Sequence, residues 1–147
     1  MPEILLAEDN PADVYLIREA LKEHRVDCTV RTAADGRDVM ALISSADRNW
    51  TPDLIILDLN LPRHDGIEIL QHLRATGTVA HVPVVVLTSS DSPQDRLIAT
   101  NLGATKYVRK PSNLDQFLQL GAVFKELLAA RVVEEVPPLA EESTHEA

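Results

Sequence analysis

The stretches LIIL at residues 54–57 and VVVL at residues 84–87 decide the fold of this chain. Both are continuously apolar, whereas a strand with one face in water alternates apolar and polar residues. Continuous apolar strands are typical of a parallel sheet that helices cover on both faces. The sequence therefore predicts an α/β fold built around a buried parallel sheet.

Weaker signals complete the pattern on either side of these two strands. A third short apolar run lies at residues 4–7, and weaker strands are predicted at 28–32 and 107–108. After each strand, apolar residues recur at helical spacing. The expected helices span residues 12–23, 36–44, 66–75, 92–102 and 113–131. The chain thus reads as five βα units that form one doubly wound sheet.

The composition excludes several functional classes. The chain has 147 residues and a formal net charge of −9, which argues against binding nucleic acid or an anionic membrane surface. No apolar run reaches the roughly 18 residues that a membrane-spanning helix needs, and the first ten residues lack a signal peptide's basic region. The single Cys28 excludes an intramolecular disulfide. We therefore expect a cytoplasmic protein without nucleic-acid or membrane partners.

Chemically capable side chains stand at the ends of the predicted strands. Glu8 and Asp9 follow the first strand, Asp58 the third and Thr88 the fourth, and Lys110 lies just past the fifth. Functional groups of such sheets gather beyond the carboxyl ends of the strands. Three converging carboxylates would repel one another unless a cation joined them. Their oxygens are hard ligands, which suit Mg²⁺.

This inventory matches transfer of a phosphoryl group to a carboxylate. Asp58 offers a nucleophilic oxygen that can form an aspartyl phosphate. Mg²⁺ and Lys110 would neutralise the phosphoryl oxygens, and the Thr88 hydroxyl would donate a hydrogen bond to another of them. Taken singly, each residue has an ordinary explanation: Glu8 and Asp9 as acids that favour a helix dipole, and Lys110 as a solvated lysine.

Four segments carry a resemblance to a known family. They are ILLAEDN at 4–10, LIILDLNLPRHDG at 54–66, VVVLTSS at 84–90 and KYVRKP at 106–111. With these motifs the chain resembles the response-regulator receiver family of two-component signalling over about residues 3–130. The resemblance implies a flavodoxin-like doubly wound (βα)5 fold with a five-stranded parallel sheet in the order 2-1-3-4-5.

The resemblance also implies a role for each matching residue in the metal site. Asp58 would be the phosphoacceptor. Asp9 and Asp58 would coordinate Mg²⁺ directly, the backbone carbonyl of Asn60 would be a third protein ligand, and Glu8 would act through a water molecule. Many members of the family have Asp where this chain has Glu8, and the extra methylene still allows a water-mediated contact.

The remaining matched residues would bind the phosphoryl group and respond to it. Lys110 corresponds to the lysine of the family and Thr88 to its switch hydroxyl. Tyr107 falls at the aromatic switch position, whose ring turns inward as the hydroxyl moves toward the phosphate. Pro111 follows the lysine, where the family often has a cis Lys-Pro bond.

Together these residues predict a single-domain response regulator, a receiver over residues 1–131 followed by an acidic tail or arm over 132–147. It would accept a phosphoryl group from a sensor histidine kinase and act on an unknown downstream protein, without being an enzyme in its own right. The nearest likeness is to stand-alone regulators of bacterial phytochrome kinases, from the opening EDNPADVYLIREAL, the loop LNLPRHDG and the long connection with Trp50.

Three other functions compete with this interpretation. A phosphohydrolase with an aspartyl nucleophile needs a second acid two residues later, where this chain has Asn60. A flavin-binding protein of similar fold needs a phosphate loop rich in Ser, Thr and Gly after the first strand, where this chain has AEDNPAD. The third alternative is a receiver-like interaction module that works without phosphorylation, which would usually lack one of the acid, Asp or Lys positions.

The last helix is apolar over about half its circumference, which is more than a single packed face needs. We therefore expect a homodimer through this helix, with Val132, Val133 and Val136 of the tail continuing the surface. The expected core stripe and its extension contain Leu114, Phe117, Leu118, Leu120, Gly121, Val123, Phe124, Leu127 and Leu128.

Overall fold

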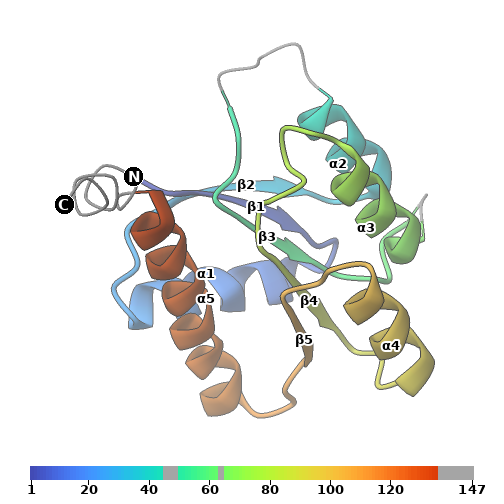
Figure 1. The fold of residues 1–147 in the computed structure, drawn as a ribbon. Coiled ribbons are helices and arrows are strands. Elements are labelled where there is room, and N and C mark those ends of the chain that lie inside the picture. The colour runs from blue at the N-terminus through green and yellow to red at the C-terminus, as the bar shows by residue number, and fades with distance from the viewer. Residues whose placement is uncertain (45–49, 63–64, 136–147) are drawn as a thin grey trace, which may run out of the picture.

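The computed structural model describes residues 1–44, 50–62 and 65–135, with five strands and five helices that alternate along the chain (Figure 1). The elements are β1 (Glu3–Ala7), α1 (Pro11–Glu23), β2 (Thr29–Ala33), α2 (Gly36–Ile43), β3 (Leu54–Leu57), α3 (Gly66–Ala75), β4 (Val84–Thr88), α4 (Pro93–Asn101), β5 (Lys106–Arg109) and α5 (Leu114–Glu135). The predicted five βα units are therefore confirmed.

All five strands are parallel and lie in the order β2-β1-β3-β4-β5, as expected. The register aligns the ends of the central strands, because Ala7 pairs with Leu57 and Leu57 pairs with Val86. The residues that follow these strands therefore meet at one edge of the sheet.

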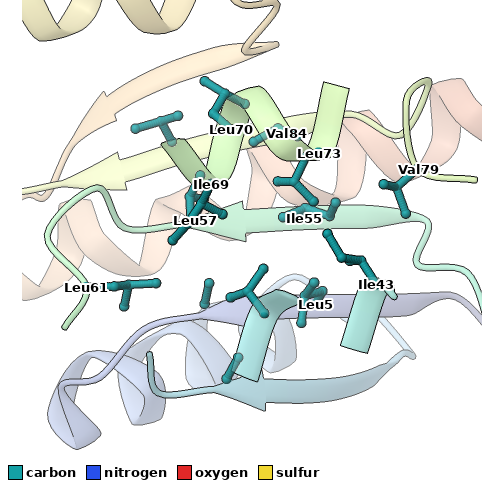
Figure 2. Close-up of a cluster of buried hydrophobic side chains, with 14 of the residues drawn as sticks. Leu5, Ile43, Ile55, Leu57, Leu61, Ile69, Leu70, Leu73, Val79 and Val84 are labelled. Atoms are coloured by element: carbon teal, nitrogen blue, oxygen red, sulfur yellow. The ribbon is translucent and has the colours of Figure 1, made fainter. Parts of the chain in front are cut away.

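Two layers of helices cover the sheet, with α1 and α5 side by side on one face and α2, α3 and α4 on the other (Figure 1). Successive residues of a strand enter different cores, because side chains alternate between the faces. Ile4 and Leu6 belong to the core beneath α1 and α5, while Leu5 belongs to the core beneath the other three helices. Figure 2 shows this second core, in which Ile55 and Leu57 of β3 meet the leucines of α3.

Helix ends follow the local sequence closely. Gly103, at φ +92°, lies just past the end of α4, where glycine adopts a left-handed backbone without steric cost. Helix α5 continues to Glu135, four residues beyond the expected end at Arg131, since no Gly or Pro lies between Arg131 and Pro137. Residues 136–147 of the expected tail lie outside the described part of the chain.

The prediction for the apolar stripe of α5 was wrong at Leu114, and Leu118, which it also placed in the core stripe, is only half-buried and lies outside the core cluster. Phe117, Leu120, Phe124 and Leu128 are buried, but the side chain of Leu114 is 57% exposed. Leu114 is the first residue of the helix and does not belong to the core beneath α1 and α5. Within the described residues, no helix is both long and apolar enough to cross a membrane.

Candidate functional site

The functional residues predicted at the strand ends do meet at one edge of the sheet. Three of them, Glu8, Asp58 and Lys110, are held by backbone hydrogen bonds that continue the pairing beyond the strands. The Glu8 N–H donates to the Ala33 carbonyl at 2.9 Å and the Asp58 N–H donates to the Ala7 carbonyl at 3.0 Å. The Lys110 N–H donates to the Thr88 carbonyl at 2.7 Å. The sheet itself therefore positions these side chains.

Lys110 lies at the centre of a group of carboxylates. Its Nζ is 2.7 Å from Asp13 Oδ2, 2.9 Å from Glu8 Oε1 and 3.0 Å from Asp58 Oδ2. The Lys110 side chain is 12% exposed, and Glu8 and Asp58 are buried. An ammonium group has three N–H donors, so these three contacts use all of them.

For both Glu8 and Lys110, burial and ion pairing shift the pKa in opposite directions. Burial raises the pKa of Glu8 to about 7, although the hydrogen bond from Lys110 opposes that rise. Burial alone would lower the pKa of Lys110, but the hydrogen bonds to Asp13, Glu8 and Asp58 outweigh it, so that pKa is raised. Lys110 is therefore charged at neutral pH, while Glu8 gains its charge only near neutrality.

Glu8, Asp9 and Asp58 form an acidic group that can hold a metal ion. One carboxylate oxygen of each lies within 4.8 Å of the other two. Asp9 is exposed, so an ion from solvent has direct access to the group. All three are hard oxygen donors, which suit a small divalent cation that keeps some of its water. The donor set therefore fits Mg²⁺, as expected from the sequence.

The loop after β3 places Asn60 beside Asp58. The Asn60 N–H donates to Asp58 Oδ1 at 2.9 Å, so both carboxylate oxygens of Asp58 accept a hydrogen bond. The loop closes where the Gly66 N–H donates to the Leu59 carbonyl at 3.1 Å. A Cβ at Gly66 would collide with the backbone of Leu59, so only glycine fits this turn.

A second chain of contacts leads from Asp58 toward α4. Thr88 is fully buried, and its Oγ1 accepts hydrogen bonds from Asn60 Nδ2 at 3.2 Å and from the Ser90 N–H at 3.3 Å. The Tyr107 hydroxyl donates to the Ser90 carbonyl at 3.2 Å. The Arg96 guanidinium of α4 lies 4.7 Å from the centre of the Tyr107 ring. Thr88 and Tyr107 are thus linked through Ser90.

Two observations at this edge differ from the sequence analysis. No peptide bond in the described ranges is cis, so the bond between Lys110 and Pro111 is trans, although the resembled family often has a cis bond there. The sequence analysis also missed Asp13, the acid of α1 that contacts Lys110. An acid in the first turn of a helix has an ordinary explanation in the helix dipole, and only the fold brings it to Lys110.

Comparison with known proteins agrees with this geometry. Residues 4–121 match the family described as response regulator receiver domain. The response regulator Rcp1 of Synechocystis sp. is 35% identical over 120 residues, which are 80% of this chain and 82% of Rcp1.

Solved structures give the same result. The phosphorylated cyanobacterial phytochrome response regulator RcpA superimposes with a TM-score of 0.79 at 38% identity, covering 87% of this chain and 94% of RcpA. The Mn²⁺-bound form of Rcp1 superimposes with a TM-score of 0.77 at 34% identity, covering 85% of this chain and 92% of Rcp1.

Proposed function

The chain belongs to the response regulator receiver family of two-component signalling, and we propose that Asp58 accepts a phosphoryl group from a sensor histidine kinase while Mg²⁺ is bound. One observation carries this proposal: Asp58 lies within both the acidic group and the contacts of Lys110. The site around Asp58 therefore combines a nucleophilic carboxylate, a group of acids that can bind a cation, and the fixed ammonium group of Lys110.

The transfer itself asks little chemistry of the protein beyond position and charge. A carboxylate oxygen of Asp58 forms a bond to phosphorus as the bond from phosphorus to the donor's imidazole nitrogen breaks. The electron pair of the broken bond stays on that nitrogen, which takes a proton from solvent. Lys110 then pairs with a phosphoryl oxygen. The protein is the phosphoacceptor, since its own side chain is modified.

The residues for the cation follow from the acidic group. Asp9 and Asp58 would hold Mg²⁺ directly, and the Asn60 carbonyl would complete the protein ligands. Glu8 would act through water, since its oxygens already accept hydrogen bonds from Lys110 and from the Asn10 N–H. Bound Mg²⁺ supplies positive charge that neutralises the oxygens of the transferring phosphoryl group.

The chain of contacts through Ser90 supports a switch. The Thr88 hydroxyl would turn from Asn60 toward a phosphoryl oxygen on Asp58. The Ser90 backbone, which bonds both Thr88 and the Tyr107 hydroxyl, would follow this movement. Tyr107 and α4 would then change the surface that a downstream protein reads.

The partner proposed is a bacterial phytochrome with histidine kinase activity. RcpA is a cyanobacterial phytochrome response regulator, and it is similar to 87% of this chain. Transfer from such a kinase takes place in the cytoplasm.

A homodimer through α5 is a further proposal with narrower support. Leu118, Val123 and Leu127 are only half-buried, and Leu114 is exposed. These side chains would be covered by the same helix of a second copy. Light scattering that shows a monomer at tens of micromolar would exclude the dimer.

The test is phosphoryl transfer from acetyl phosphate, read as intact mass with and without Mg²⁺. We expect the wild type to gain one phosphoryl group only with Mg²⁺, and Asp58→Asn to gain none. Asp27→Asn, which removes an exposed acid outside the site, is the matched control and should behave as the wild type does. If neither acetyl phosphate nor phytochrome kinases modified the wild type, the interaction module that works without phosphorylation would replace this proposal.

A further inference from the structure

Asp13 makes the shortest of the three contacts to the Lys110 ammonium, yet the transfer as proposed gives it no role. We propose that Asp13 is a positioning residue that holds Lys110 in place for phosphoryl transfer to Asp58. This inference rests on the proposed function, and it adds a carboxylate from α1 to the residues that serve the same site.

The contact is not explained by the start of the helix alone. Asn10 already caps α1, because its Oδ1 accepts hydrogen bonds from the Ala12 N–H at 2.9 Å and the Asp13 N–H at 3.4 Å. The Asp13 carboxylate instead contacts a residue 97 positions away, beyond the end of β5. It therefore joins the first turn of α1 to the segment that carries Lys110.

Asp13 differs from the other two partners of Lys110 in its relation to the acidic group. Glu8 and Asp58 both belong to the group that can hold a cation, whereas Asp13 does not. When Glu8 serves the cation and Asp58 carries the phosphoryl group, their contacts with Lys110 must change. The contact from Asp13 is free to persist through the whole transfer.

A persistent anchor matters because of the chemistry of lysine. Its ammonium is a compact charge on a flexible four-carbon stem, so the stem alone does not fix its position. The side chains of Lys110 and Asp13 are 12% and 18% exposed, so their ion pair is largely shielded from water. Without Asp13, the ammonium would keep only Glu8 and Asp58, and it would compete with the cation for their oxygens.

The experiment compares three substitutions on one helix. Asp13→Asn keeps the size of the side chain and removes its charge, and Asp13→Glu keeps the charge. Glu19→Gln is the matched control, because it removes an acid of α1 that pairs with the exposed Lys22 at 3.3 Å, away from Lys110. The rate of Asp58 phosphorylation is measured against acetyl phosphate concentration at saturating Mg²⁺, so that a change in cation affinity does not contribute.

We expect Asp13→Asn to lower the maximal rate on the order of tenfold, because the neutral amide oxygen of Asn accepts a weaker hydrogen bond from the Lys110 ammonium than a carboxylate does. Asp13→Glu should recover part of the rate, and Glu19→Gln should match the wild type. In a Lys110→Met background, Asp13→Asn should cause no further loss, because the residue it positions is gone. Equal losses in both backgrounds would overturn the proposal.

Nitrogen-15 NMR of the lysine ammonium groups gives a readout that does not depend on activity. We expect the wild type and Glu19→Gln to show a protected Lys110 ammonium signal, and Asp13→Asn to lose it. An Asp13→Asn protein that keeps both this signal and the wild-type rate would overturn the inference and leave the proposed function intact. A wild type that no donor phosphorylates would overturn the proposed function itself.

Discussion

The two sides of the site are built from different kinds of contact. On the acidic side, which comprises Glu8, Asp9, Asp13, Asp58 and Lys110, the Lys110 ammonium contacts three shielded carboxylates directly, and the exposed Asp9 completes the acidic group. On the switch side, which comprises Thr88, Ser90, Arg96 and Tyr107, neutral hydrogen bonds run to a half-exposed ring that an exposed arginine covers.

The difference teaches how one edge of a sheet can serve both chemistry and signalling. Buried charges are strongly coupled, since removing one leaves the others without compensation. Neutral hydrogen bonds near the surface contribute about 1 kcal/mol each, so they can exchange partners at small cost. The acidic side is therefore suited to fix a reaction geometry, and the switch side to change its conformation.

The largest effect should follow from removing the charge that unites the acidic side. Lys110→Met leaves three carboxylates without their ammonium, and we expect the free energy of unfolding to fall by about 3 kcal/mol in metal-free buffer. Mg²⁺ should restore more stability to this variant than to the wild type, because it replaces part of the lost positive charge. Urea unfolding with and without Mg²⁺ measures both effects.

The neighbouring residue supplies the matched control for that variant. Arg109→Met also removes a cation at the end of β5, but its side chain is 62% exposed and its partner Asp91 is 70% exposed. An exposed pair of this kind contributes about 1 kcal/mol or less. Equal destabilisation by Lys110→Met and Arg109→Met would show that the charges of the acidic side are no more strongly coupled than the exposed pair of Arg109 and Asp91.

A smaller effect should appear in the pH dependence of the acidic side. The pKa of Glu8 in the folded protein is about 7, above its ordinary value of 4.5. Between these values the folded state binds more protons than the unfolded state, so the free energy of unfolding falls as pH rises through this window. The loss attributable to Glu8 is up to about 3 kcal/mol.

Metal-free unfolding from pH 4.5 to pH 8 tests this dependence. Glu8→Gln should remove the decline that Glu8 causes, whereas Asp95→Asn, beside the switch side, should keep it. Mg²⁺ added above pH 7 should offset the decline in the wild type, since the charged carboxylate then has a cation nearby. Parallel curves for Glu8→Gln and the wild type would contradict the assigned pKa.

The sequence predicted the residues of the site that directly follow strands, but it did not predict the contacts that helix packing makes. The apolar runs at 54–57 and 84–87 predicted the sheet, and the rule that functional groups follow strand ends brought Glu8, Asp58 and Lys110 together. Both rules use only the positions of residues along the chain, which can be taken directly from the sequence. The residues of the acidic side that extend strands were predictable for this reason.

Contacts made by helix packing were not predictable in the same way. Asp13 reaches Lys110 because α1 lies beside the end of β5, and no local pattern indicates that proximity. Leu114 has the right helical spacing for the core, yet it is exposed because it is the first residue of α5. The roles of Asn60, Thr88 and Tyr107 in the switch stay predictions, although the structure places the three on one chain of contacts.

The smallest effect should come from the outer end of the switch side, where Arg96 covers the Tyr107 ring. Arg96 is exposed, so Arg96→Ala should lower the free energy of unfolding by about 1 kcal/mol at most. The ring should nevertheless become more mobile, because its contact with the Arg96 guanidinium of α4 is lost. In NMR spectra, we expect the Tyr107 ring signals of Arg96→Ala to differ from those of the wild type before phosphorylation. Phosphorylation should then change these signals less in the variant than in the wild type.

Arg31→Ala is the matched control for that variant. It removes a similar contact, since Arg31 lies 4.6 Å from the centre of the Trp50 ring, but Trp50 is bonded to Glu3 at the start of β1, away from the switch side. The two variants should lose similar stability, and only Arg96→Ala should alter the Tyr107 signals. If Arg31→Ala and Arg96→Ala altered the Tyr107 signals equally, the ring would be responding to a general loss of stability. The switch side would then not behave independently of the rest of the sheet.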